Sequence, residues 1–337
     1  MCEAFALRAG HLLKTCVAAA AWLALALAGT ATSAKDAPAP VPAASTAATN
    51  PAAAADTGID APPEQRWVAR TDRDRIGRIW VPVLINDKGP FRLALDTGAS
   101  NTAVTPDVAL ALGLSPAASD RVVLRGVTGS ATVPTIPVDG LVVGDLALPS
   151  RRLPIIANGL GGADGILGTE GMLDKRITID FHHGSIVIAR SRGERAGAGF
   201  VVIPFKLHDG LAVVDARIGR VAGRAIIDTG GQGTIGNVAL HESLVSRYRK
   251  EAVVPDGIVG VTLDVQLGNR IDTPPILLGS VAIGHVQVTT GDMEIFRQWR
   301  MTHEPVVLIG MDVLGLFDVL VIDYARRELQ VRIAHDS

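Results

Sequence analysis

Two acidic residues occupy the same short sequence context 132 residues apart. Asp96 begins the tripeptide Asp-Thr-Gly in RLALDTGASNT, and Asp228 begins it again in RAIIDTGGQGT. A run of aliphatic residues precedes each acid, which is typical of a buried strand that ends at a turn. Such a strand would hold a carboxyl group on a rigid element, so the sequence predicts two rigidly positioned carboxyl groups.

Both copies also share a downstream element. DGILG, ending at Gly168, comes after the first copy, and VVLIG, ending at Gly310, comes after the second. These glycines lie 72 and 82 residues after their acids, and TIDF or VIDY follows each one before a last strand. A third Asp-Thr-Gly, at Asp56, has no strand before it and no such partner behind it, so we interpret it as a chance match.

A pair of nearby carboxyl groups has a defined chemistry. Two carboxyls about 3 Å apart cannot both ionise, so they share one proton and titrate as a unit. The ionised member can take a proton from a water that attacks an amide carbonyl, while the protonated member supports the developing oxyanion. The reaction needs no covalent intermediate, metal or cofactor. A need for two carboxyls explains why the phrase occurs twice.

The residues after each acid suit the same purpose. Gly98 and Gly230 let a second chain segment approach closely. Thr97 and Thr229 each offer a hydroxyl that can bond across to the sister loop and so hold the two carboxyls together. We therefore expect these four residues to support the loops of Asp96 and Asp228.

The chain resembles the aspartic peptidases, and among them the bacterial retropepsin-like enzymes. The resemblance runs from about residue 76 to residue 333. Its motifs are Asp96–Ser100 with Ile166–Gly168, and Asp228–Gly231 with Leu308–Gly310. It implies that Asp96 and Asp228 are catalytic, that the threonines link the two loops, and that the substrate is a polypeptide. The second half departs from the first, with Gly231 and Gln232 where the first has Ala99 and Ser100.

The mechanism also requires a flap that covers the substrate and excludes water. RGVTGSATV is a candidate hairpin whose tip would be Gly126, Val127, Thr128 and Gly129. PDGIVGVTL, around Gly257 to Gly260, is its counterpart in the second half. Neither segment contains a tyrosine, and the sequence does not rank one flap above the other.

The fold class expected is all-β, because short Val/Ile/Leu runs alternate with Gly, Pro, Asn and Asp. The resemblance implies a bilobal acid-protease fold, with two β-barrel-like lobes related by a pseudo-twofold axis. We expect an N-terminal lobe at residues 66–190, a linker at 191–199 and a C-terminal lobe at 200–337. Because one chain carries both lobes, a monomer would suffice.

The first residues have the layout of a secretory signal peptide. A basic patch is followed by an apolar run and small residues, which predicts a signal peptide over 1–34. The alternative is that the leader remains uncleaved as a membrane anchor, and this is the only membrane contact that we expect. Residues 35–65 are rich in Ala and Pro and predict a disordered spacer. The two cysteines, Cys2 and Cys16, fall in the leader, which favours a periplasmic or secreted bacterial protein without disulfides.

Other function classes lack their signals. A net charge of −2 with scattered Lys and Arg gives no reason to expect a nucleic-acid partner. His241 and His303 begin like zinc-binding helices but lack the second histidine, so no metal or other cofactor is expected. Two alternatives remain: a peptide-binding protein without activity, whose second loop is degraded, and an enzyme assembled from the first lobes of two chains.

Overall fold

The computed structural model describes residues 69–70, 77–158, 161–248 and 253–333. They belong to one compact unit that begins at residue 61. The expected signal peptide (1–34) and spacer (35–65), with Asp56, lie outside the described residues and stay predictions. Within the described ranges, no helix is long and apolar enough to span a membrane.

The first half is built on a seven-stranded sheet with the order β4-β8-β3-β2-β6-β5, in which β7 also pairs with β6. At its centre β3 runs parallel to β8, and β4 runs antiparallel along the other side of β8. Helix α1 begins after Thr105 with Pro106 in its first turn, and Gly113, whose φ is 75°, caps it after Leu112. The elements are β2 (Trp80–Ile85), β3 (Lys88–Leu95), β4 (Ala103–Val104), α1 (Pro106–Leu112), β5 (Arg121–Arg125), β6 (Ser130–Val143), β7 (Leu146–Pro154) and β8 (Gly165–Leu167).

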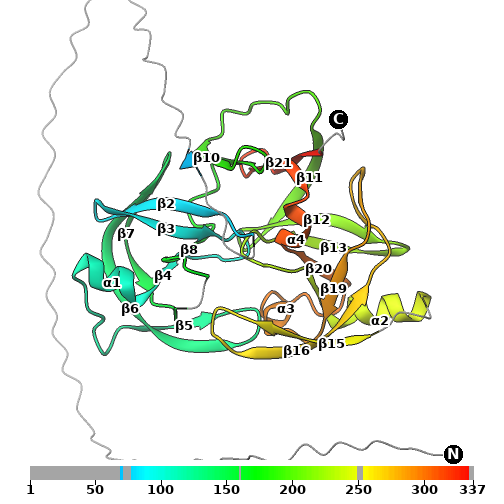
Figure 1. Cartoon of the computed structure of the whole chain (residues 1–337), viewed down its shortest axis with the longest axis horizontal. Coiled ribbons are helices and arrows are strands. Elements are labelled where there is room, and N and C mark those ends of the chain that lie inside the picture. Colours follow the sequence, from blue (N-terminus) through cyan, green and yellow to red (C-terminus); the bar gives the residue numbers. More distant parts are fainter. Residues whose placement is uncertain (1–68, 71–76, 159–160, 249–252, 334–337) are drawn as a thin grey trace, which may run out of the picture. The chain divides into compact units, whose positions relative to one another are not determined.

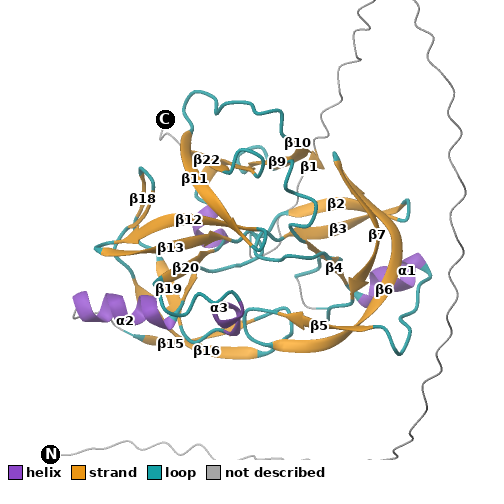
Figure 2. Ribbon diagram, turned by 180° about the vertical axis from the view of Figure 1, so that it is seen from behind, coloured by secondary structure: helices purple, strands orange, loops and turns teal. Residues whose placement is uncertain are grey.

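The second half repeats this pairing scheme. Strand β13 runs parallel to β20, and β14 runs antiparallel along the other side of β20. The elements are β12 (Leu211–Ile218), β13 (Val221–Ile227), β14 (Ile235–Gly236), α2 (Val238–Arg247), β15 (Val254–Val259), β16 (Val265–Asp272), β17 (Ile276–Leu278), β18 (Val281–Ile283), β19 (Gln287–Thr290), α3 (Glu294–Gln298), β20 (Val306–Ile309) and α4 (Met311–Leu314). Figures 1 and 2 show the two halves side by side, with β3 and β13 leading toward the centre.

A shared sheet joins the halves. Six of its strands lie in the order β1-β10-β9-β21-β22-β11, so each strand of the first half has a counterpart in the second, and β11 continues the sheet into β12. The middle pair, β9 and β21, is antiparallel, with Thr178 opposite Val321. The strands are β1 (Ala69–Arg70), β9 (Lys175–Asp180), β10 (Ser185–Arg190), β11 (Val201–His208), β21 (Phe317–Asp323) and β22 (Glu328–Ile333).

One buried ion pair crosses this shared sheet. Asp323 on β21 is 0% exposed and accepts hydrogen bonds from Arg176 on β9 and from Ser191, each at 3.0 Å. The acid in VIDY is therefore a structural residue. Asp180, its counterpart in TIDF, accepts a bond from the backbone N–H of His183 near the surface.

The burial pattern explains why these segments are strands. Strand β9 alternates buried and half-buried residues, as expected where one face covers a core. The short strands β8 and β20 are buried throughout, which fits central strands in parallel pairing. The all-β, two-lobed fold class expected from the sequence is confirmed.

Candidate active site

Asp96 and Asp228 lie at equivalent places in the two halves. Asp96 follows the last residue of β3, and its N–H donates to Leu167 O of β8 at 3.0 Å. Asp228 follows β13, and its N–H donates to Ile309 O of β20 at 3.0 Å. A pair of parallel strands thus holds each acid. The two carboxyls lie beside each other, each against the glycine of the opposite loop.

Four buried hydrogen bonds join the two acidic loops. Thr97 Oγ1 donates to Ile227 O at 2.7 Å and accepts from the N–H of Thr229 at 3.0 Å. Thr229 Oγ1 donates to Leu95 O at 2.8 Å and accepts from the N–H of Thr97 at 3.2 Å. Both threonines are 0% exposed. Each hydroxyl satisfies a carbonyl and an amide of the opposite half, so neither loop has its complete set of bonds without the other.

Positions 98 and 230 need glycine because the opposing loop approaches them closely, and not because of their backbone conformation. A Cβ built on Gly98 would lie 2.7 Å from Asp228 Oδ1, and one on Gly230 would overlap the carboxyl of Asp96. Each glycine also donates its N–H to the acid of its own loop at 2.9 Å. The group that these glycines admit is therefore the opposing carboxyl.

Burial raises the pKa of both carboxyls, and the neighbouring Asp228 adds to the rise at Asp96. The pKa of Asp96 is well above its ordinary value, first because burial disfavours the charged form and second because Asp228 lies beside it. Burial raises the pKa of Asp228 as well, and hydrogen bonds from the N–H groups of Gly230 and Gly231 oppose this rise. The pair consequently keeps one shared proton to higher pH than a free carboxyl would.

Gly231 and Gln232 replace the Ala99 and Ser100 of the first loop, and the second loop keeps its hydrogen bonds despite this difference. Gly231 N–H donates to Asp228 Oδ1 at 3.1 Å, and its carbonyl accepts from Met311 N–H at 2.8 Å. Gln232 O accepts from Asp312 N–H at 3.0 Å. A Cβ at position 231 would lie 2.8 Å from Asp228 Oδ2, so glycine makes room for the acid here.

A second acid and a threonine support each loop, and they were not predicted from the sequence. Thr102 donates its N–H to Glu170 at 2.7 Å and accepts from Gly168 N–H at 3.1 Å. Thr234 bonds Asp312 through its N–H and its hydroxyl, at 3.0 and 2.8 Å. The available signal was spacing: each threonine lies six residues after its catalytic candidate, and each acid lies two residues after the glycine of the downstream element.

Two hairpins meet over the carboxyl pair. Flap 1 is the β5–β6 hairpin, whose tip is the predicted Gly126–Gly129 segment. Flap 2 is the β15–β16 hairpin, whose tip runs from Gly260 to Asp264. Gly257, expected near that tip, instead lies within β15 opposite Leu267.

The flap tips touch each other and cross to the opposite halves. A Cβ on Gly126 would lie 3.0 Å from Val261 Cγ1, and one on Gly260 would overlap the Thr128 hydroxyl. Val127 of flap 1 packs against an apolar cluster of the second half, and Val261 of flap 2 packs against one of the first. Both tips carry Gly-Val-Thr, a repeat that is readable in the sequence.

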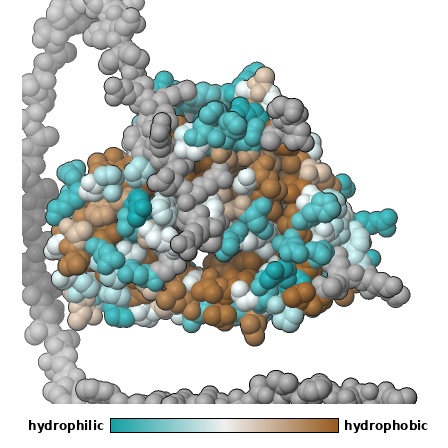
Figure 3. Space-filling view, viewed as in Figure 1, coloured by the Kyte–Doolittle hydropathy of each residue, from teal (hydrophilic) through white to brown (hydrophobic). Residues whose placement is uncertain are grey.

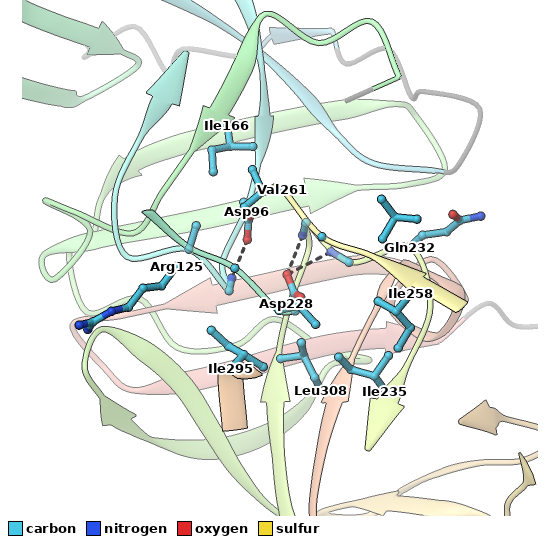
Figure 4. Close-up of a pocket in the computed structure, with 18 of the residues that line it drawn as sticks. Asp96, Arg125, Ile166, Asp228, Gln232, Ile235, Ile258, Val261, Ile295 and Leu308 are labelled. Carbon is cyan, nitrogen blue, oxygen red and sulfur yellow. Dashed lines mark hydrogen bonds between the residues drawn. The ribbon is translucent and has the colours of Figure 1, made fainter. Parts of the chain in front are cut away.

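A cleft of about 1430 Å³ lies between the flaps and the carboxyl pair. It is larger than the roughly 300–1,000 Å³ that is usual for small-molecule sites. In Figure 3, hydrophobic side chains gather over the lower part of this face, where the flaps lie. Figure 4 shows Ile166 and Val261 beyond Asp96, and Ile235, Ile295 and Leu308 beyond Asp228. Within the described ranges, no cluster of three or more metal-ligating side chains occurs.

Residues 81–170 match the family model of aspartyl proteases. This segment contains the Asp96 loop and the Ile166–Gly168 element, so the first half is similar to aspartyl proteases. A crystal structure of an aspartic proteinase from Irpex lacteus aligns with 80% of this chain and 98% of its own, at 15% identity and a TM-score of 0.47. No curated protein matches the sequence.

Proposed function

We propose that the chain is an aspartic endopeptidase in which Asp96 and Asp228 together activate a water for attack on a peptide bond. The observation that carries the proposal is the contact between two carboxyls of raised pKa, locked by reciprocal threonines at the floor of a large cleft. The size of the cleft favours a stretch of polypeptide as the substrate over a small molecule.

The roles of the two acids are inferred from the shared proton. Asp228 receives two N–H bonds, which favour its ionised form, so it acts as the base that accepts a proton from water. Asp96, whose carboxyl accepts the N–H of Gly98, is then the protonated partner and donates a hydrogen bond to the developing oxyanion. After attack, the proton taken by Asp228 passes to the leaving amine. The dyad then returns to its singly protonated state.

One chain supplies both acids, and the proposal therefore includes activity as a monomer. It also includes export through the N-terminal leader and action in the periplasm or outside the cell, as the leader sequence predicts.

The test is cleavage of a denatured protein between pH about 3 and 7, where a shared-proton dyad operates. Asp96→Asn and Asp228→Asn should each abolish cleavage while circular dichroism and the unfolding midpoint show a folded protein. Asp56→Asn, in the third Asp-Thr-Gly, is the matched control and should keep full activity.

The same experiment separates the two alternatives. Peptide binding without cleavage by the unaltered chain would favour a binding protein. The intact hydrogen bonds of the second loop argue against a degraded site. Full activity of Asp228→Asn would favour an enzyme built from the first lobes of two chains.

A further inference from the structure

Helix α3 of the second half is the docking site for the tip of flap 1. The N–H of Ile295, in the first turn of α3, donates to Val127 O of flap 1 at 3.3 Å. Gln298 Nε2, at the end of α3, donates to Ser130 Oγ of flap 1 at 3.4 Å. The Val127 side chain packs against the apolar cluster that contains Ile295. Figures 1 and 2 show α3 beside the place where the two hairpins meet. Flap 1 is therefore held on the opposite half by polar and apolar contacts together.

The contact with flap 1 also completes α3. Met293 precedes the helix and makes no side-chain capping bond, so the first-turn N–H of Ile295 has no partner within the helix. The carbonyl of Val127 satisfies this N–H. In the described part of the first half, no helix stands between β7 and β8, which is the equivalent place. Flap 2 consequently has no equivalent helix there on which to dock.

Among the described residues, the tip of flap 2 is held on the first half by apolar packing alone. Val261 packs against an apolar cluster of that half, and no hydrogen bond joins Gly260–Asp264 to its described residues. The hydroxyls of Thr128 and Thr262, one on each tip, are buried where the tips meet and have no hydrogen-bond partner in the described ranges. Burying a hydroxyl without a partner is unfavourable. The contact between the tips is therefore easier to break than the contact of flap 1 with α3.

Two glycines lie within the strands of flap 2. Gly257 of β15 is opposite the residue before Gly268 of β16, so the two glycines are neighbours in the middle of the hairpin. When the hairpins are aligned on the first glycine of each tip, the equivalent residues of flap 1 are Val123 and Val133. A glycine weakens a strand and permits backbone conformations that a β-branched valine resists. Flap 2 therefore contains a hinge where flap 1 has a stiff pair of strands.

The base of flap 2, on the other side of these glycines from the tip, is anchored. Asp256 accepts hydrogen bonds from Arg270 Nη2 at 2.7 Å and from Thr289 Oγ1 at 2.6 Å. These residues lie on β15, β16 and β19, so the network ties the base of the hairpin to the neighbouring strand. A fixed base and a weakly held tip, with glycines between them, are the parts of a hinged lid.

We propose, on the basis of the endopeptidase function above, that the two flaps have different tasks: α3 positions flap 1 over the carboxyl pair, and flap 2 is the gate for the substrate. Flap 1 stays docked through the positioning residues Ile295 and Gln298. A polypeptide enters when flap 2 bends at Gly257 and Gly268 and its tip leaves the first half. The two hairpins, which are equivalent in the fold, thus differ in motion.

The test measures the movement of each flap by the distance between two spin labels. Cys2→Ser and Cys16→Ser remove the two natural thiols, so labels attach at introduced cysteines alone. The label pairs, all at exposed residues, are Val265→Cys with Leu110→Cys for flap 2 against the first half, and Val123→Cys with Val245→Cys for flap 1 against the second half. The flap 2 pair should give the broader distance distribution, with a longer component that a statine-containing peptide removes. A flap 1 distribution as broad as that of flap 2 would overturn the inference.

Gly257→Ala links the movement to the hinge. A Cβ at this position has only Val265 Cγ1 within 4 Å, at 3.5 Å, so alanine fits the closed structure. It should reduce the longer component of the flap 2 pair and lower kcat/KM about two- to fivefold, because fewer molecules are open to bind substrate. Gly284→Ala, at an exposed position with nothing within 4 Å of the added Cβ, is the control and should change neither. An unchanged distance distribution in Gly257→Ala would contradict the hinge.

Val127→Ala and Gln298→Ala test the docking of flap 1. Each variant removes a contact with α3, so the flap 1 distribution should broaden and KM should rise more than kcat falls. An unchanged flap 1 distribution in both variants would show that α3 does not hold the flap. If no peptide is cleaved, the protease function fails instead, and the label distances of the free protein still decide which flap moves.

Discussion

A disulfide between the flap tips would test whether the flaps must separate for a substrate to reach the carboxyls. Gly129→Cys with Asp264→Cys suits this purpose, because a Cβ at position 129 lies 3.6 Å from the Cβ of Asp264. Disulfides usually span about 3.5–4.5 Å between Cβ atoms. The only natural cysteines are Cys2 and Cys16, in the expected leader. The remainder of the sequence offers no competing thiol.

The magnitude of the constraint depends on the length of chain that the bond encloses. The bond would close a loop from residue 129 to residue 264, for which chain entropy gives about 5 kcal/mol of stabilisation. Because the distance needs no backbone movement, little of this should be lost to strain. The oxidised protein should therefore unfold at a higher temperature than the reduced protein, and its flaps should stay in contact.

The assay is cleavage of a denatured protein before and after reduction with a thiol reagent. Activity should fall in proportion to the oxidised fraction and return on reduction, while each single-cysteine variant keeps its activity in both states. Full activity of the oxidised protein would refute the reasoning, because a substrate would then reach the dyad without flap separation. A lower unfolding temperature on oxidation would show that the two tips are not adjacent in solution.

Three further predictions concern the threonine hydrogen bonds between the two acidic loops, the carboxyl pair and the shared sheet. Thr97→Val should lower the free energy of unfolding by about 2–6 kcal/mol, because it leaves a buried carbonyl and a buried amide unpaired; Thr97→Ser, which keeps the hydroxyl, should cost clearly less in denaturant unfolding. The pKa of Asp96 is raised in the folded state, so the unaltered chain loses free energy of unfolding as pH rises through that pKa. Asp96→Asn cannot lose it, and its stability relative to the unaltered chain should therefore increase from pH 4 to pH 8. A constant difference would contradict this. Asp323→Ala should cost about 3–5 kcal/mol by leaving Arg176 without its buried partner, whereas Asp215→Ala, in an exposed pair, should leave the unfolding midpoint unchanged.

The sequence predicted the all-β fold because its signal is local and repeated. Aliphatic runs with turn residues between them determine strands, and the double Asp-Thr-Gly located the two loops within a repeated order of elements. The adjacency of Asp96 and Asp228 could be expected only because both copies shared the later Gly168 and Gly310 contexts. Spacing and context together were sufficient to predict a contact between residues 132 positions apart.

The flap contact and the supporting acids depend on tertiary packing, which no single segment encodes. The tip of flap 2 lies beyond Gly257 because β15 continues through that glycine in register with β16. A glycine in a strand has the same local signature as a glycine in a turn. Likewise, Glu170 and Asp312 resemble ordinary surface acids until the fold places them against the N–H groups of Thr102 and Thr234.

Each half of the molecule completes the site of the other, and this explains why the motif had to be duplicated in its whole context. Thr97 bonds the carbonyl next to Asp228, Gly98 makes room for the carboxyl of Asp228, and Val127 of flap 1 packs in the second half. Equivalent contacts run in the opposite direction. Because the threonine bonds among these crossed contacts are buried, losing one half should remove the bonds that position the other acid. Cleavage activity and the cooperative unfolding of the two halves should therefore be lost together in variants of Thr97 and Thr229.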